Sequence, residues 1–212
     1  MMKESTLQPP HSIGMSIANV AASSAEQDDV ALVAACLAGD QDAFALLVQR
    51  HQRRVFNLVF RMLQQYDEAN EVTQDVFLAA WQGLSSFRGD ARFSTWLYRI
   101  AYNCALKQLE QRKKDWALQA AIQAEPIESE EQVGVELAEA HDRQEFVREH
   151  LSMLPAKYRA VLILRHLQDM TYEEMAEILT MPIGTIKTHL FRARNLLKER
   201  LEAFEHEWKT RG

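Results

Sequence analysis

The chain has 212 residues, which is enough for one large domain or for two small domains with cores of their own. Only seven glycines and five prolines occur, beside abundant Ala, Leu, Glu and Gln, and this composition favours an all-α protein. No apolar run of about eighteen residues occurs, and no apolar segment follows a basic N-terminus, so we expect neither membrane insertion nor a signal peptide. Two cysteines make no disulfide framework, and we expect a cytoplasmic protein with reduced thiols.

The formal net charge of −6 looks wrong for a nucleic-acid binder, but the charge is unevenly distributed. Between Asp115 and Glu145 there are nine acidic residues and one Arg, a net charge of −8, so the rest of the chain carries +2. Between Arg88 and Lys114 the net charge is +5. The acidity is therefore concentrated in one middle segment between two basic ones, and nucleic-acid binding is not excluded.

The first predicted helices follow a polar N-terminal stretch. Residues 1–27 show no periodicity and predict a disordered tail. Apolar residues at helical spacing predict a short helix from Asp28 that ends at Gly39, followed by a long, strongly apolar helix capped by Asp40. The long helix is expected to be central to its domain.

A third helix is predicted from Asp67, as its N-cap, to Leu84. Its apolar residues can face the core, while a second face combines acidic, amide and aromatic side chains. Such a stripe is either a solvated surface or a docking face for a basic partner. Glu68, Glu71 and Asp75 lie on it at roughly helical spacing, with Gln74 and Phe77 alongside.

A Gly-containing polar loop follows, and Ser94 is expected to cap a helix that runs to about Arg112. Any one aromatic residue here is best explained by core packing. So many rings amid positive charge also suit single-stranded nucleic acid, because bases stack on rings while cations follow phosphates. The interleaved residues are Phe87, Arg88, Arg92, Phe93, Trp96, Tyr98, Arg99 and Tyr102.

The acidic stretch 115–140 contains Pro126 and clustered carboxylates, and it predicts a flexible linker with helix, if any, before Ala124. A second helical domain, 141–203, follows. Pro155 stands where a proline at the first position of a helix is expected. After Leu201 the sequence predicts fraying into a polar tail, 204–212.

The stretch from Thr171 to Arg200 predicts two helices joined by a tight turn. Thr171 and Glu174 have the spacing of a capping box, and Pro182 and Gly184 interrupt the apolar period before a second helix near Thr185. That second helix carries five Lys/Arg and one Glu. The pattern is typical of a helix-turn-helix that reads a major groove, although an amphipathic helix pair with a solvated basic face also fits it.

Four segments in this order resemble the extracytoplasmic-function (ECF) group of sigma-70-type sigma factors. They are DEANEVTQDVFLAAW, FRGDARFSTWLYRIAYN, LPAKYRAVLILRHLQDMTYEEMAEIL and IGTIKTHLFRARNLL. The resemblance spans Asp29 to Leu201. It implies two small helical domains, region 2 at 28–114 and region 4 at 141–203, joined by the acidic linker, with no catalytic activity and no cofactor or metal.

The resemblance also implies three partners: core RNA polymerase, promoter DNA and an anti-sigma factor. The face formed by Glu71, Gln74, Asp75 and Phe77 would dock on the coiled coil of the polymerase β′ clamp, region 4 would meet the β flap, and the linker would enter basic polymerase channels. The melted minus-ten strand would be bound by Phe87, Arg88, Asp90, Trp96, Arg99 and Asn103. The minus-thirty-five duplex would be read by Lys187, Thr188, Phe191, Arg192 and Arg194.

Two departures and two rival functions remain. Many family members have Gly where Thr180 stands, so the turn is expected to differ slightly or to be strained. Lys107 and Gln108 stand where the family frequently has an Asp. A dimeric helix-turn-helix regulator would bind its operator without polymerase. An enzyme with a helical nucleic-acid-binding appendage would need a catalytic constellation, and the seven histidines are scattered, with His189 in the recognition helix.

Overall fold

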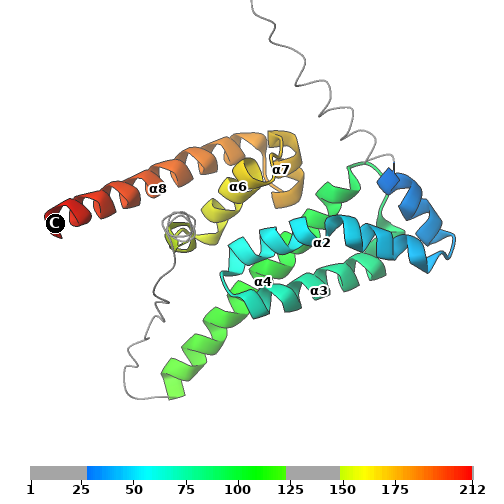
Figure 1. Ribbon diagram of the computed structural model, residues 1–212, viewed down its shortest axis with the longest axis horizontal. Coiled ribbons are helices and arrows are strands. Elements are labelled where there is room, and N and C mark those ends of the chain that lie inside the picture. Colours follow the sequence, from blue (N-terminus) through cyan, green and yellow to red (C-terminus); the bar gives the residue numbers. More distant parts are fainter. Residues whose placement is uncertain (1–27, 123–148, 212) are drawn as a thin grey trace, which may run out of the picture.

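The computed structural model describes residues 28–122 and 149–211, and every regular element in these ranges is helical (Figure 1). The predicted tail 1–27 and most of the predicted acidic linker lie outside the described residues. The all-α prediction is confirmed. The elements are helix 28–37, α2 (Gln41–Leu63), α3 (Tyr66–Gly83), the 3-10 turn η1 (Leu84–Ser86), α4 (Phe93–Ile122), helix 149–152, α6 (Ala156–Leu167), α7 (Tyr172–Leu179) and α8 (Ile183–Arg211).

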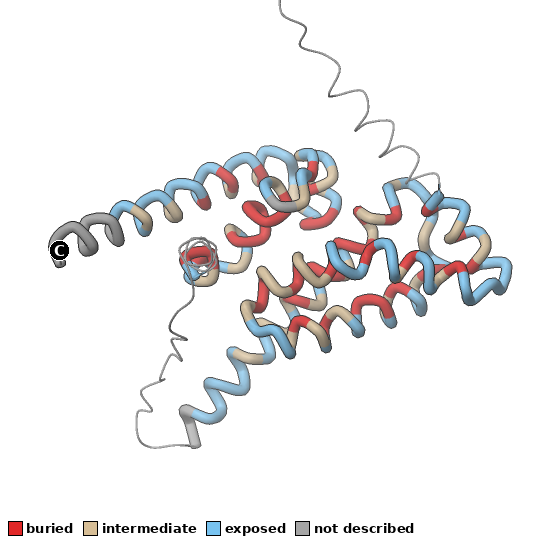
Figure 2. The backbone as a smooth tube through the Cα atoms, in the orientation of Figure 1, coloured by how far each residue is buried: buried red, intermediate tan, exposed pale blue. Residues whose placement is uncertain are grey.

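Helices α2, α3 and α4 pack pairwise around the core of the first domain, and their buried faces turn inward (Figure 2). Asp40 caps α2 as predicted, because its carboxylate accepts from the backbone N–H groups of Asp42 and Ala43. The centre of this core is fully apolar. It contains Leu47, Val55, Leu58, Val59, Met62, Val76, Leu97 and Ala101.

A buried ion pair fastens helix 28–37 to α2. The carboxylate of Asp29 accepts from Arg50 at 2.6 Å and meets Nε2 of His51 at 2.8 Å, and the side chains of Asp29 and His51 are both less than a tenth exposed. Burial alone raises the pKa of Asp29, but the hydrogen bonds and charges of His51 and Arg50 outweigh it, and the net shift is downward. The carboxylate therefore stays ionised inside the bundle.

The second domain is built from helix 149–152, α6, α7 and α8. The predicted capping box is present: Thr171 Oγ1 accepts from Glu174 N, and the Glu174 carboxylate accepts from Thr171 N. The turn after α7 places Thr180 at φ 53° and ψ 48°, the left-handed region in which a β-branched residue is strained, as expected. Ile186 and Leu190 of α8 are buried.

Several predicted helix ends are wrong. The N-cap of α3 is Gln65 rather than Asp67, because Tyr66 joins the helix and packs edge-on against Phe56 and Phe60. Helix α4 starts at Phe93, before the predicted cap Ser94, and continues past Arg112 to Ile122, since residues 113–122 are mostly good helix formers without Gly or Pro.

Two further boundaries differ in the second domain. Helix α8 continues to Arg211 instead of fraying after Leu201. Pro155 is the N-cap of α6 and precedes the first helical residue, Ala156, by one position. Within 28–122 and 149–211, no helix combines the length and the apolar content needed to cross a bilayer.

Candidate nucleic-acid and polymerase interfaces

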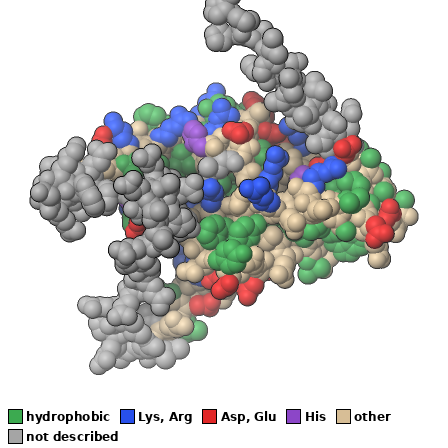
Figure 3. Space-filling model, in the orientation of Figure 1, with side chains coloured by type: hydrophobic (Ala, Val, Ile, Leu, Met, Phe, Trp, Pro, Cys, Tyr) green, Lys and Arg blue, Asp and Glu red, His purple; other side chains and the backbone are tan. Residues whose placement is uncertain are grey.

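Helix α8 presents a basic face that includes the exposed aromatic ring of Phe191. Ile186, Leu190 and Ala193 bury one side of the helix, so the residues between them point outward. Phe191 is 66% exposed, an unusual position for a large apolar side chain. Figure 3 shows Lys and Arg side chains along the part of the surface where α8 lies. All five residues predicted for the duplex element are exposed, and they are Lys187, Thr188, Phe191, Arg192 and Arg194.

The surroundings of these five side chains differ. The ammonium of Lys187 lies 5.5 Å from the centre of the Tyr172 ring on α7, which positions it. The hydroxyl of Thr188 donates to the Gly184 carbonyl at 2.9 Å and is thus already engaged. Arg194 Nη2 lies 3.3 Å from Nε2 of His166. Arg192 and Phe191 project from the face more freely.

His189 does not belong to this face. Its half-buried ring packs edge-on against Tyr158 of α6, with ring centres 5.4 Å apart. Burial lowers the pKa of His189, and the positive charges of Lys157 and Arg192 lower it further. The imidazole is therefore neutral at pH 7 and acts as a packing residue.

A second candidate interface lies where the loop after η1 meets the start of α4. Phe87, Phe93 and Trp96 form a three-ring cluster, with centre-to-centre distances of 5.4–5.8 Å. Phe93 is buried, whereas Phe87 and Trp96 are only half-buried and keep part of each ring accessible. Gly89, at φ 77°, allows the loop to turn.

The polar residues predicted for the melted strand surround this cluster. Arg88 and Asp90 are exposed on the loop, and Arg99 and Asn103 are exposed along α4 at helical spacing from Trp96. The predicted set therefore shares one surface. Tyr98 and Tyr102, which the sequence placed among the interleaved rings, belong to the core instead, with exposures of 1% and 6%.

Part of this surface faces the second domain. Asp90, Trp96 and Arg99 line a cleft of about 460 Å³ whose opposite wall is α7 and the turn that follows it. The residues of that wall are Ala176, Glu177, Thr180, Met181 and Pro182. Sequence reasoning did not predict this juxtaposition.

The predicted docking face of α3 is partly as expected. Glu71, Gln74 and Asp75 are exposed side by side. Phe77 does not join them, because its position on the helix turns it into the core, where it is 9% exposed. Leu78, at 55% exposed, takes the place expected for Phe77, since it lies four residues after Gln74 and three after Asp75. That helical spacing was the signal that sequence reasoning missed.

A further aromatic residue extends this side of α3. Trp81 is 40% exposed and packs edge-on against Phe44 of α2, with ring centres 4.8 Å apart. Among the side chains that the structure describes, no group of three His, Cys, Asp or Glu residues is arranged to hold a metal ion.

Comparison with known proteins identifies the family of the chain. Residues 47–115 match the family model "Sigma-70 region 2", and residues 147–197 match "Sigma-70, region 4". The chain is 37% identical to the ECF RNA polymerase sigma-E factor of Escherichia coli K12, over 82% of this chain and 94% of that protein. It is 35% identical to the ECF RNA polymerase sigma factor SigW of Bacillus subtilis, over 77% of this chain and 91% of the relative.

A solved structure shows the same fold. CnrH in complex with the cytosolic domain of CnrY aligns with a TM-score of 0.63 and 25% identity, covering 83% of this chain and 98% of CnrH. The region 2 match precedes the region 4 match along the chain, and the alignment with sigma-E covers 94% of that relative. The chain belongs to the ECF group of sigma-70-type RNA polymerase sigma factors.

Proposed function

We propose that this sigma factor reads a promoter with two surfaces of different chemistry while α3 holds core RNA polymerase. The observation that carries the proposal is the difference in chemistry between two surfaces: a cationic helix face on α8 and an aromatic cluster at the start of α4. Duplex DNA requires the first kind of surface and an unpaired strand the second. We assign region 2 to 28–114 and region 4 to 141–203.

The face of α8 suits the major groove at the minus-thirty-five element. Lys187 and Arg192 donate to guanine O6 and N7 or to phosphate, and Phe191 packs on a thymine methyl group. A good base contact discriminates by about 1–3 kcal/mol. Arg194, held near His166, contacts phosphate, and Thr188 approaches the backbone or a base edge.

The surface around Phe87 and Trp96 suits the melted minus-ten strand. Extrusion of a base costs a few kcal/mol, which stacking on an accessible ring and hydrogen bonds in a pocket offset. Asp90 accepts from a base amino group, while Arg88 and Arg99 follow the phosphates. The exposed amide of Asn103 extends this surface along α4.

For polymerase we propose that Glu71, Gln74, Asp75 and Leu78 meet the coiled coil of the β′ clamp, and that region 4 meets the β flap. Leu78 provides apolar area at the centre of an otherwise acidic face, as protein interfaces require. The similar sigma factor RpoE of Bartonella quintana is solved in complex with the anti-sigma factor NepR, and this likeness supports an anti-sigma factor for the present chain as well. Because a bacterial polymerase subunit acts in the cytoplasm, we propose that the chain is cytoplasmic.

The experiment is a pull-down with core polymerase together with promoter-specific transcription. We expect Asp75→Arg to weaken polymerase binding, because it reverses a charge on the docking face. Glu110→Arg is the matched control, since Glu110 is equally exposed but lies on α4. Equal polymerase binding by both variants would contradict the docking assignment.

The same assays separate the rival functions. A dimeric regulator binds its operator tightly without polymerase, whereas the proposed function requires core polymerase for tight promoter binding and yields a promoter-specific transcript.

A further inference from the structure

We propose that the buried Asp29–His51 pair is a brace that orients the rings of the strand-binding surface, so that helix 28–37 takes part in minus-ten recognition from inside the bundle. This inference rests on the proposed function, because it concerns the rings assigned to the melted strand. Asp29 precedes residues 47–115, which match the region 2 model. The inference therefore gives a positioning role to a segment outside that match.

Hydrogen bonds hold the pair between helix 28–37 and α2. Asp29 Oδ2 lies 2.8 Å from His51 Nε2, and Asp29 Oδ1 accepts from Arg50 at 2.6 Å. An ionised carboxylate can only accept, so His51 Nε2 carries the proton and donates it to this bond. The imidazole is 5% exposed, so burial confines the part of the ring that the bond leaves free. The position of the His51 ring is therefore set by Asp29.

The His51 ring lies against Phe93, the buried ring of the aromatic cluster. The two ring centres are 5.4 Å apart, and the planes are inclined at 59°. Phe93 is 2% exposed and contacts both accessible rings, with 5.8 Å between its centre and that of Phe87 and 5.7 Å to that of Trp96. Because packed side chains transmit displacements to their neighbours, a shift of His51 reaches both accessible rings through Phe93.

Trp96 is confined on another side as well. Gly83, at the end of α3, lies so close that an added Cβ would sit 3.6 Å from Trp96 Cζ2. The indole is thus packed against Gly83 and the rings of Phe87 and Phe93. Its orientation depends on where Phe93 lies.

Stability alone does not explain a polar pair in this place. Apolar side chains of similar volume often replace a buried ion pair without loss of stability, because they avoid the cost of desolvating a charge. An apolar side chain packs by shape, whereas the hydrogen bond to Asp29 gives the His51 ring a defined direction. Ring orientation is what a stacking surface requires, since stacking depends on the angle and offset between the planes.

The test separates stability from strand binding with two variants at the same pair. Asp29→Ala/His51→Leu keeps the summed side-chain volume nearly unchanged and leaves neither side chain as a buried polar group. Asp29→Asn removes the charge but keeps a hydrogen bond to the imidazole, because an amide can both donate and accept. Holoenzyme formed with saturating core polymerase is titrated against a fluorescein-labelled single strand with the non-template minus-ten sequence of a promoter that the chain transcribes.

We expect the two variants to differ in opposite ways. The apolar double variant should unfold at the denaturant concentration of the wild type or above it, yet bind the strand on the order of tenfold more weakly, because one stacked base contributes roughly fivefold to 150-fold. Asp29→Asn should unfold at a lower denaturant concentration, yet bind the strand as tightly as the wild type. Wild-type affinity in the double variant, or affinities that follow the unfolding midpoints, overturns the inference.

A further variant keeps the test decisive if the apolar double variant does not fold. His51→Gln retains an N–H donor for the Asp29 carboxylate and removes the ring that contacts Phe93. It should bind the strand more weakly than Asp29→Asn does. Equal affinity of these two variants also overturns the inference.

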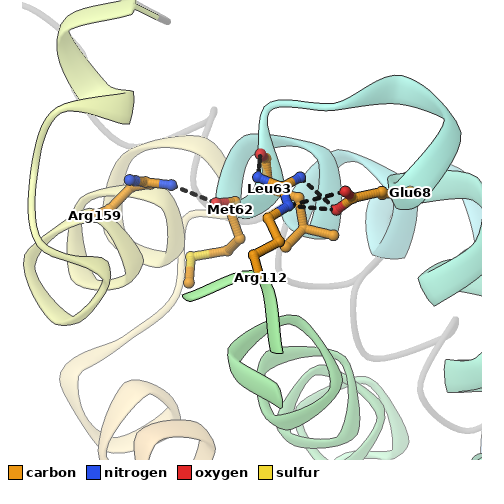
Figure 4. Close-up of polar contacts among 5 residues, drawn as sticks. All are labelled: Met62, Leu63, Glu68, Arg112 and Arg159. Carbon is orange, nitrogen blue, oxygen red and sulfur yellow. Dashed lines mark hydrogen bonds and ion pairs between the residues drawn. The ribbon is translucent and has the colours of Figure 1, made fainter. Parts of the chain in front are cut away.

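Glu68→Leu is the matched control. Glu68 forms an ion pair with Arg112 in the same domain, and Arg112 Nη1 also donates to the Leu63 carbonyl (Figure 4). Arg112 lies about 24 Å along α4 from Trp96, at 1.5 Å per residue. The control also replaces a paired carboxylate by an apolar side chain, so it should lower the unfolding midpoint and leave strand affinity unchanged. An equal loss of strand affinity in this control would show a general effect of the domain and overturn the inference.

A Trp96→Leu background tests the route from the pair to the strand. If the pair acts through the rings, Asp29→Ala/His51→Leu should cause a much smaller further loss of affinity once Trp96 is replaced. The same fold loss in both backgrounds contradicts transmission through Trp96.

The wild type distinguishes the two possible failures. If wild-type holoenzyme prefers the minus-ten strand over an unrelated strand of equal length, and the apolar double variant binds it equally well, the brace is wrong and the proposed function stands. If the wild type shows no such preference and yields no promoter-specific transcript, the proposed function itself fails.

Discussion

The replacement Arg192→Ala tests how α8 reads DNA. Arg192 is exposed on α8, so its removal should leave the free energy of unfolding within about 0.5 kcal/mol of the wild type. Its guanidinium projects from the same face as Lys187 and Phe191 and has the fork geometry that suits guanine O6 and N7. Loss of such a contact costs about 1–3 kcal/mol, or roughly fivefold to 150-fold in promoter affinity.

The assay compares holoenzyme binding to a promoter and to versions with single base-pair changes in the minus-thirty-five element. We expect Arg192→Ala to weaken binding to the original sequence and to lose discrimination at one position. Arg194→Ala is the comparison, because Arg194 is held near His166 and is assigned to phosphate. It should weaken binding to all sequences alike and reduce the salt dependence by about one counterion. If Arg192→Ala shows that same uniform loss, base readout by this residue is refuted.

Three further predictions address the cluster, the turn and the buried ion pair. Trp96→Leu should weaken binding of the melted strand by about 1–3 kcal/mol and leave binding of the minus-thirty-five duplex unchanged. Fluorescence anisotropy measures both affinities. Thr180→Gly should raise the free energy of unfolding by about 1 kcal/mol in thermal melts, because Gly tolerates positive φ. A lower free energy of unfolding would contradict the inference that Thr180 is strained. Asp29→Ala should lower it by about 3 kcal/mol, since it leaves His51 buried without its carboxylate. The pKa of Asp29 is lower in the folded protein, so its contribution to stability is fully present above the ordinary aspartate pKa of about 4 and is lost as the pH falls further. In denaturant titrations below that pH, the free energy of unfolding should therefore fall less in Asp29→Ala than in the wild type.

Local signals predicted the local structure well. The capping box of Thr171 and Glu174 and the cap at Asp40 each depend on residues within a few positions, and both are present. The alternation of buried and exposed positions on α8 follows from its helical period. The predicted N-cap at Asp67 is wrong because aromatic packing of Tyr66 on another helix extends α3, and local sequence does not contain that contact.

The candidate sites show the same difference between features set by local sequence and features that depend on distant contacts. Helical spacing brought Glu71, Gln74 and Asp75 to one face, whereas Phe77 was placed there as well and lies in the core. The contact between Arg159 and the Met62 carbonyl joins residues 97 positions apart, and it depends on how two finished domains meet. No periodicity or motif encodes such a contact, so it was not predictable from the sequence.

The central claim is tested most directly by transcription of genomic DNA with core polymerase, with and without the chain, followed by sequencing of the RNA 5′ ends. The account predicts new 5′ ends that appear only with the chain and share sequence motifs near minus thirty-five and minus ten. It also predicts that Asp75→Arg reduces the yield of these ends and that Glu110→Arg preserves it. Identical 5′ ends with and without the chain, together with tight duplex binding by the chain alone, would contradict the account.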